Sequence, residues 1–121
     1  MTTVLFLDNP HAHKDTIDEL RRSFPSLEAT VTFSQVERKI EEGNYRIIII
    51  DPLSVRSSYG PSQLVREVIG SGSRVVLAEG ALSADFLRLR QGIDYHIRHP
   101  KPYNVEELVK QIAEQIEEST Q

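Results

Sequence analysis

No cysteine occurs among the 121 residues of this chain. Its absence excludes a disulfide framework, a thiolate zinc site and a cysteine nucleophile. No apolar run approaches the roughly 20 residues that a membrane-spanning helix needs. The first residues lack a basic region followed by a long apolar core, so we expect no signal peptide, no membrane partner and a cytoplasmic location.

The chain also lacks an excess of basic residues. It has 14 lysines and arginines against 18 aspartates and glutamates, for a net charge of −4. No basic field stands out, which disfavours direct binding of nucleic acid. The length suits one compact domain over residues 1–121, which can equally be one domain of a longer protein.

Four consecutive isoleucines, Ile47 to Ile50, run into Asp51 and Pro52. An unbroken β-branched run is typical of a strand buried on both faces, within a parallel sheet between helix layers. Proline cannot extend the ladder, so Asp51 is expected at the strand's carboxyl end. Ligands and chemistry gather at that end in open α/β sheets, although an aspartate before proline can also simply cap a turn.

Apolar spacing along the chain predicts five repetitions of strand followed by helix. Strands are expected at 4–7, 28–33, 45–50, 75–77 and 95–97, and helices at about 17–24, 34–43, 61–70, 83–92 and 104–118. Capping boxes begin the second and last helices at Ser34 and Asn104. This order favours an α/β fold with a doubly wound, five-stranded parallel sheet and helices on both faces.

The turn after the first strand lacks a phosphate-binding loop. It reads Asp8-Asn9-Pro10-His11, with no glycine that would let a pyrophosphate approach the backbone, and no Walker A pattern occurs elsewhere. The sequence therefore disfavours a nucleotide- or flavin-binding function.

Charged groups follow three of the expected strands instead. With the strand order 2-1-3-4-5, Asp8 and Asp51 meet at one edge of the sheet. With the Asn9 amide they make a hard-oxygen site of the kind that Mg²⁺ prefers. Lys101 can reach this site as a phosphate-binding cation. The alternatives are an Asx-type turn at Asp8 and Asn9, and an exposed lysine at 101.

Five segments match one known family: 4–9, 47–52, 74–77, 92–95 and 101–108. The most specific is the lysine-proline-aromatic turn that begins at Lys101 and leads into the final helix. With these segments the chain resembles a response regulator receiver domain (CheY-like) over essentially its whole length. The resemblance implies a flavodoxin-like fold with a cis Lys101–Pro102 peptide. It also implies Asp51 as phosphoacceptor, Asp8 as a metal-site acid and Lys101 as the phosphate-binding lysine.

Several positions depart from the family pattern. Asn9 stands where the family has a second acid, which weakens Mg²⁺ binding by one negative charge. Ala78 or Glu79 stands where the family has a serine or threonine hydroxyl at the end of strand four. The loop over 53–60 lacks the usual pattern, and either Tyr95 or Arg98 takes the place of the family's switch aromatic.

Two functions follow from the resemblance. The chain is either a receiver-like module of a two-component phosphorelay, phosphorylated on Asp51 by a histidine kinase, or a pseudo-receiver that acts through protein contact alone. In neither case is it an enzyme acting on a metabolite. The expected partner is a histidine kinase or another signalling protein. A homodimer is also conceivable, through the face formed by helix 4, strand 5 and helix 5, with Arg88, Arg90, Tyr95, Ile97 and Arg98.

The four histidines form two pairs in the sequence. His11 and His13 follow the first strand, and His96 and His99 lie on or after the fifth. A zinc or copper site is conceivable. Without thiolates or tight ligand spacing, solvated loop imidazoles are the favoured interpretation.

Overall fold

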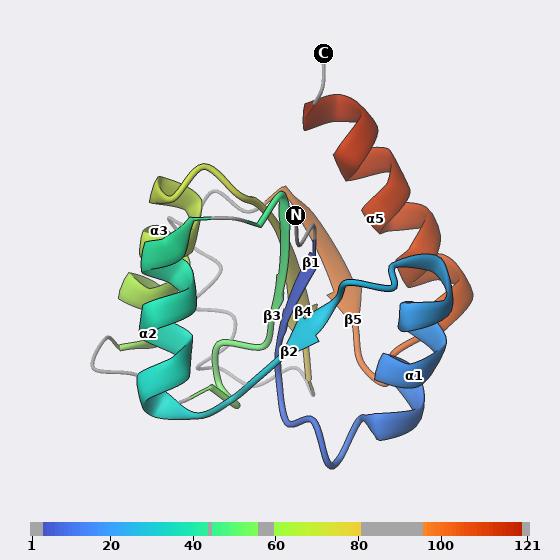
Figure 1. Ribbon diagram of the computed structural model, residues 1–121, viewed down its shortest axis with the longest axis horizontal. Helices are drawn as coiled ribbons and strands as arrows, with labels where there is room; N and C mark the ends of the chain where they lie inside the picture. Colours follow the sequence, from blue (N-terminus) through green and yellow to red (C-terminus); the bar gives the residue numbers. More distant parts are fainter. Residues whose placement is uncertain (1–3, 44, 56–59, 81–95, 120–121) are drawn as a thin grey trace.

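The structure is a computed structural model that describes residues 4–43, 45–55, 60–80 and 96–119. Within these ranges one sheet contains five parallel strands in the order β2-β1-β3-β4-β5. The strands are β1 (Val4–Leu7), β2 (Glu28–Ala29), β3 (Ile47–Ile50), β4 (Arg74–Glu79) and β5 (Ile97–Pro100). The α/β fold and the predicted strand order are confirmed (Figure 1).

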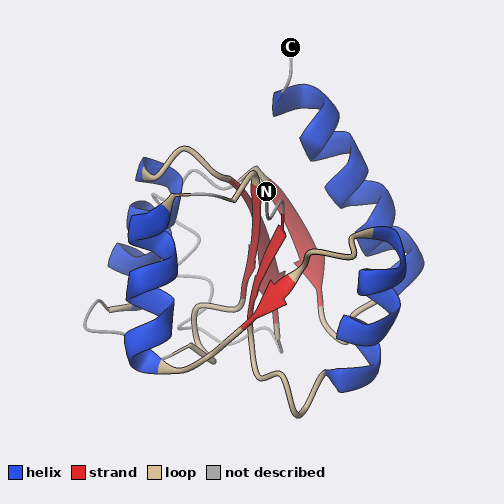
Figure 2. Cartoon of the chain, in the orientation of Figure 1, coloured by secondary structure: helices blue, strands red, loops and turns tan. Residues whose placement is uncertain are grey.

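Helices cover both faces of the sheet (Figure 2). On one face lie α1 (Lys14–Ser23) and α5 (Val105–Ser119), and on the other lie α2 (Phe33–Glu42) and α3 (Pro61–Gly70). The isoleucines of β3 contribute to the core on both faces of the sheet, because successive strand residues point to opposite sides. Ile48 and Ile50 pack in the core with α2 and α3, whereas Ile47 and Ile49 pack in the core with α1 and α5.

The strand register aligns the carboxyl ends of the central strands. Leu7 of β1 pairs with Ile50 of β3, and Ile50 pairs with Leu77 of β4. The next residues in the chain, Asp8 and Asp51, therefore leave the sheet at the same level. The Asp51 backbone N–H donates to the Leu7 carbonyl at 3.1 Å, which extends the pairing to the first residue of the loop.

The edge strand β2 is shorter than predicted. It ends at Ala29 instead of residue 33, because the chain turns at Thr30. The buried Thr30 hydroxyl contacts the Gln35 side-chain oxygen at 2.9 Å and accepts the Thr32 backbone N–H. The N-cap of α2 is consequently Thr32, and the predicted capping box at Ser34 is wrong.

Three other helix boundaries agree with the local sequence signals, whereas α1 begins at Lys14 instead of about residue 17. Gly43 ends α2 with φ of 66°, a left-handed conformation that glycine adopts without strain. Pro61 occupies the first turn of α3. At the start of α5, the Asn104 side-chain oxygen accepts the Glu107 backbone N–H at 3.0 Å, as a capping residue should.

The fifth strand lies further along the chain than predicted. It covers Ile97–Pro100 instead of 95–97, and β4 also extends beyond 75–77 to Arg74–Glu79. Along β5 the side chains alternate between the inside and the solvent, with His99 buried and Arg98 exposed. The predicted helix over 83–92, and Tyr95, lie outside the described residues.

His99 joins β5 to α5 through a buried polar contact. Its side chain is 1% exposed, so the expected solvated imidazole is wrong at this position. Its Nε2 accepts the Asn104 backbone N–H at 3.1 Å, which leaves the proton on Nδ1 to be donated to Gln111 Oε1 at 2.7 Å. Gln111 in turn donates to the Arg98 carbonyl. Among the described residues, every buried side-chain nitrogen and oxygen has a partner.

None of the described helices combines the length and the apolar character that crossing a bilayer requires.

Replacing Gln111 with leucine should lower the free energy of unfolding by about 1–3 kcal/mol, because the buried Nδ1–H of His99 would lose its acceptor. The change can be measured by urea denaturation. Gln63→Leu on α3, where the amide is exposed, is the matched control and should alter stability little. Equal stability of the two variants would show that the His99 contact does not hold α5 to the sheet.

Candidate functional site

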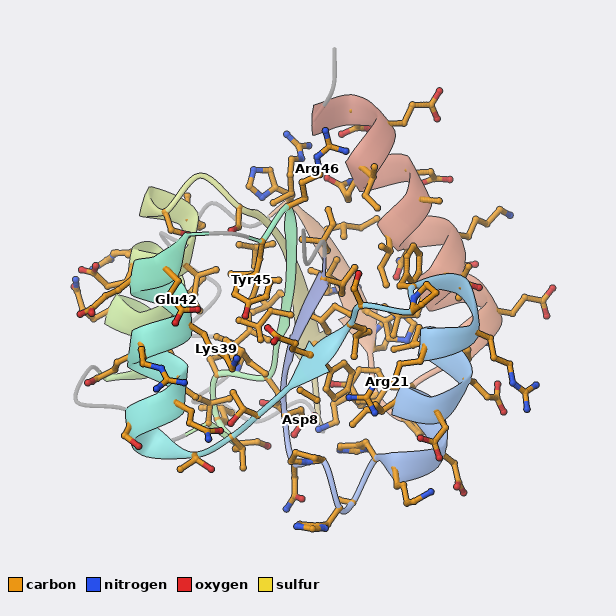
Figure 3. All side chains as sticks on the ribbon, viewed as in Figure 1. Asp8, Arg21, Lys39, Glu42, Tyr45 and Arg46 are labelled. Carbon is orange, nitrogen blue, oxygen red and sulfur yellow. The ribbon has the colours of Figure 1, made fainter. Side chains whose placement is uncertain are left out.

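Three charged side chains from separate loops meet at the carboxyl edge of the sheet. The Lys101 Nζ donates to Asp8 Oδ2 at 2.8 Å and to Asp51 Oδ2 at 2.7 Å. Asp8 follows β1 at the lower end of that strand in Figure 3, Asp51 follows β3, and Lys101 follows β5. The convergence predicted for these three residues is therefore present in the structure. The Lys101–Pro102 peptide is cis, as the resemblance implied.

Asp51 is held by its own loop as well as by the lysine. Its Oδ1 accepts the Leu53 backbone N–H at 3.1 Å, and its Oδ2 accepts the Ser54 hydroxyl at 3.1 Å. The residue is 4% exposed. Asp51 was expected either to cap a turn or to belong to a site at the edge of the sheet. The structure shows both, because the same carboxylate caps its turn and contacts Lys101.

Asp8 receives more donors than any sequence signal indicated. Its Oδ2 accepts hydrogen bonds from the Lys101 ammonium at 2.8 Å and from the Tyr103 hydroxyl at 2.7 Å, and it lies 3.2 Å from His13 Nε2. Its Oδ1 accepts the Asn9 backbone N–H at 2.7 Å. Asp8 itself is 1% exposed, so its charge is balanced almost entirely by protein groups.

Two of these neighbours of Asp8, His13 and Tyr103, were not predicted as site residues. His13, expected in solvent, lies against Asp8 with only 22% of its side chain exposed. Tyr103 is the aromatic residue of the lysine-proline-aromatic turn, but no local pattern reveals where its hydroxyl points. Its ring packs at centroid distances of 5.0 Å from His13, 5.2 Å from Phe6 and 5.7 Å from His99.

Asn9 forms the Asx-type turn that was the alternative to a metal role. Its side-chain oxygen accepts the backbone N–H groups of His11 at 3.0 Å and Ala12 at 3.2 Å. The amide oxygen is therefore engaged in its own loop, and a ligand role for Asn9 stays a prediction. Within the described ranges, no three histidine, aspartate or glutamate side chains are grouped to hold a metal ion.

The electrostatics of the site favour a charged lysine and a neutral phenol. Burial by itself would lower the pKa of Lys101, but hydrogen bonds and charge from Asp51 and Asp8 outweigh it and raise the pKa above 10.5. Burial, followed by the Asp8 charge, raises the pKa of Tyr103 far above its usual range. At neutral pH one ammonium and one phenol O–H thus face two carboxylates.

The strand register identifies the residue that faces Asp51 from β4. Because Ile50 pairs with Leu77, the following residue Ala78 lies at the level of Asp51, one position before Glu79. Ala78 is fully buried and brings no hydroxyl to the site. Of the residues proposed for a partner surface, Ile97 is half-buried and Arg98 exposed on β5, while Arg88, Arg90 and Tyr95 lie outside the described residues.

Comparison with known proteins gives the fold but no close relative. No protein-family model matches the sequence, and no curated protein matches it. Among solved structures, a CheY-like receiver domain protein from Methanospirillum hungatei has a TM-score of 0.76 at 18% identity, covering 99% of this chain and 97% of that one. The receiver domain of a DNA-binding response regulator from Colwellia psychrerythraea has a TM-score of 0.77 at 14% identity, covering 97% and 99%.

A third similar structure holds a metal ion. It is the receiver domain of a sensor histidine kinase from Pseudomonas aeruginosa, with magnesium coordinated in its active-site cleft. Its TM-score is 0.73 at 18% identity, covering 95% of this chain and 97% of that one. These likenesses show that the chain has the receiver-domain fold.

Replacing Lys101 with methionine should destabilise the fold by about 3 kcal/mol at pH 7, because two buried carboxylates would lose their shared cation. In the folded protein the pKa of Lys101 is raised above 10.5. The charged lysine therefore contributes its full stabilisation of the fold below pH 10.5, and this contribution is lost as the pH rises through the folded pKa.

The control is Lys14→Met, and both variants can be compared by denaturation across pH. Lys14 has the same 2.7 Å ion-pair distance, to Asp18, but both side chains are exposed. We expect little change in its stability. Similar losses for the two variants would contradict a buried, charge-balanced site at Lys101.

Proposed function

We propose that the chain is a receiver-like signalling module in which Asp51 accepts a phosphoryl group from a histidine kinase. The observation that carries this proposal is the Lys101 ammonium, which contacts the Asp8 and Asp51 carboxylates at once. Carboxylates at strand ends beside a fixed cation suit phosphoryl transfer, which depends chiefly on positioning and on neutralisation of charge.

The transfer follows from the groups present. One Asp51 oxygen would attack phosphorus and form an acyl phosphate, while the bond from phosphorus to the kinase imidazole breaks and the imidazole leaves with its electron pair. The Leu53 N–H keeps the Asp51 carboxylate oriented at Oδ1. Lys101 already contacts Oδ2 and would balance the added negative charge on the phosphoryl oxygens.

The donor set also fits a magnesium ion in its chemistry. Asp8 and Asp51 present hard carboxylate oxygens that share the Lys101 ammonium, and their two charges exceed the single charge of Lys101. Asp8 and Asp51 would hold the ion, with Asn9 as a further proposed ligand. When bound, Mg²⁺ would neutralise phosphoryl oxygens. The magnesium in the similar Pseudomonas aeruginosa domain supports this choice of ion.

A second function is favoured by two specific observations. Ala78 provides no hydroxyl at the level of Asp51, so one contact that could distinguish a phosphorylated state is missing. Asp8 is also satisfied by protein donors alone. A pseudo-receiver that binds a signalling partner without phosphorylation is the alternative. In both cases the proposed contact face includes β5 and the outer side of α5.

Incubation with a small acyl phosphate and Mg²⁺ should add the mass of one phosphoryl group, which intact mass spectrometry can detect. Asp51→Asn should abolish the adduct, because the amide is not a nucleophile of this kind. Asp18→Asn, on the exposed surface of α1, is the control and should react like the unaltered chain. No adduct at high donor concentration would overturn the phosphoacceptor role and leave the pseudo-receiver.

A further inference from the structure

The Asp8 carboxylate is already saturated on the side that faces the site. A carboxylate oxygen offers about two lone-pair directions, and Oδ2 of Asp8 already accepts from two donors, Lys101 and Tyr103. His13 Nε2 also lies 3.2 Å from this oxygen. A cation that uses this oxygen must therefore take the place of at least one of these groups.

Tyr103 lies closer to Asp8 Oδ2 than His13 does. Its hydroxyl lies 2.7 Å from Oδ2, whereas His13 Nε2 lies at 3.2 Å. The Tyr103 ring is stacked on His99, with an angle of 18° between the ring planes, and it also touches Phe6. His99 is itself held by Gln111 of α5. The phenol is thus held against Asp8 by the packing of its ring as well as by its hydrogen bond.

The hydrogen bond between Tyr103 and Asp8 has a definite direction. A carboxylate oxygen can only accept, so at 2.7 Å the Tyr103 hydroxyl is the donor. The O–H then points toward the carboxylate oxygen, which is where a metal ion would have to approach that lone pair. A protonated phenol cannot share this lone pair with a divalent cation.

We propose that the Tyr103 hydroxyl competes with a divalent cation for Asp8 Oδ2, and that Tyr103 therefore sets the cation affinity of the site. This inference rests on the proposed binding of Mg²⁺ by Asp8 and Asp51. In the absence of the cation, the hydroxyl supplies a donor that Asp8 would otherwise lack. When the cation binds, that hydrogen bond is lost, and its loss weakens the observed affinity.

Tyr103→Phe isolates this effect because it removes the hydroxyl and keeps the ring that packs on His99. The variant should bind Mg²⁺ about tenfold more tightly than the unaltered chain in calorimetric titrations, since a hydrogen bond to a charged group no longer has to be broken. If the hydroxyl instead only oriented Asp8 as a metal ligand, removing the hydroxyl would weaken Mg²⁺ binding. The two roles therefore predict opposite changes in affinity.

Tyr45→Phe is the matched control. Tyr45 is also buried, and its hydroxyl donates to the Glu28 carboxylate. It packs in the core on the α2 and α3 side, away from Asp8 (Figure 3). Its removal deletes the same kind of hydrogen bond and should leave the Mg²⁺ affinity unchanged.

A second measurement uses the unaltered chain and so does not depend on the folding of a variant. The sequence has no tryptophan, so tyrosine emission is directly observable. A phenol hydrogen-bonded to a carboxylate emits weakly, and emission should therefore rise as Mg²⁺ displaces Tyr103 from Asp8. The rise should persist in Tyr45→Phe.

The outcomes separate the inference from the proposed function. Equal or weaker Mg²⁺ binding by Tyr103→Phe, or constant emission at saturating Mg²⁺, would overturn the competition while magnesium binding stands. If neither the unaltered chain nor Tyr103→Phe binds Mg²⁺, both the competition and the proposed metal role fail. Phosphorylation of Asp51 is judged by its own mass measurement.

Discussion

The ammonium of Lys101, held between two buried carboxylates, is the interaction on which the rest of the site depends. Asp8 and Asp51 are 1% and 4% exposed, and burying two such charges without a cation would cost several kcal/mol per ion. The lysine that balances them lies 93 and 50 residues away in sequence. One cation therefore ties the loops after β1, β3 and β5 together.

The same neutralisation shapes what the site can do. A receiver-like function needs the two carboxylates near one another and near a cation, and the fold provides both. Yet Asp8 also accepts from Tyr103 and lies beside His13, and Ala78 brings no hydroxyl from β4. Asp8, Asp51 and Lys101 are the groups that the proposed phosphoryl transfer requires, but protein groups already balance their charges, and Ala78 offers no hydroxyl at the level of Asp51. This combination explains why phosphorylated and phosphorylation-independent functions both follow from one geometry.

Much of the architecture was predictable because it depends on strong local signals. The run from Ile47 to Ile50 can only be accommodated in a strand covered on both sides, and Asp51 follows from where that strand ends. Once the parallel order is inferred, Asp8 must lie beside it, and the turn at Lys101 brings the third charge. The identity of Mg²⁺ as a ligand and the roles of these residues remain proposals.

The positions that the sequence did not predict have a common physical cause. Each depends on a hydrogen bond between a polar side chain and a partner outside its own local pattern. His99 can be buried on β5 only because Gln111 and the Asn104 backbone satisfy both ring nitrogens. Strand β2 ends before Thr30, whose hydroxyl contacts Gln35. Local β-propensity cannot predict that contact. The contribution of Tyr103 depends on a hydroxyl reaching Asp8, 95 residues away.

The most direct test of the central claim is a double-mutant cycle between Lys101 and Asp51. The free energies of unfolding of the unaltered chain, Lys101→Met, Asp51→Asn and the double variant would be measured at pH 7 by urea denaturation. A buried contact predicts a coupling energy above about 1 kcal/mol, with the double variant more stable than the sum of the single changes predicts. Additive effects within about 0.5 kcal/mol would contradict a shared, charge-balanced site.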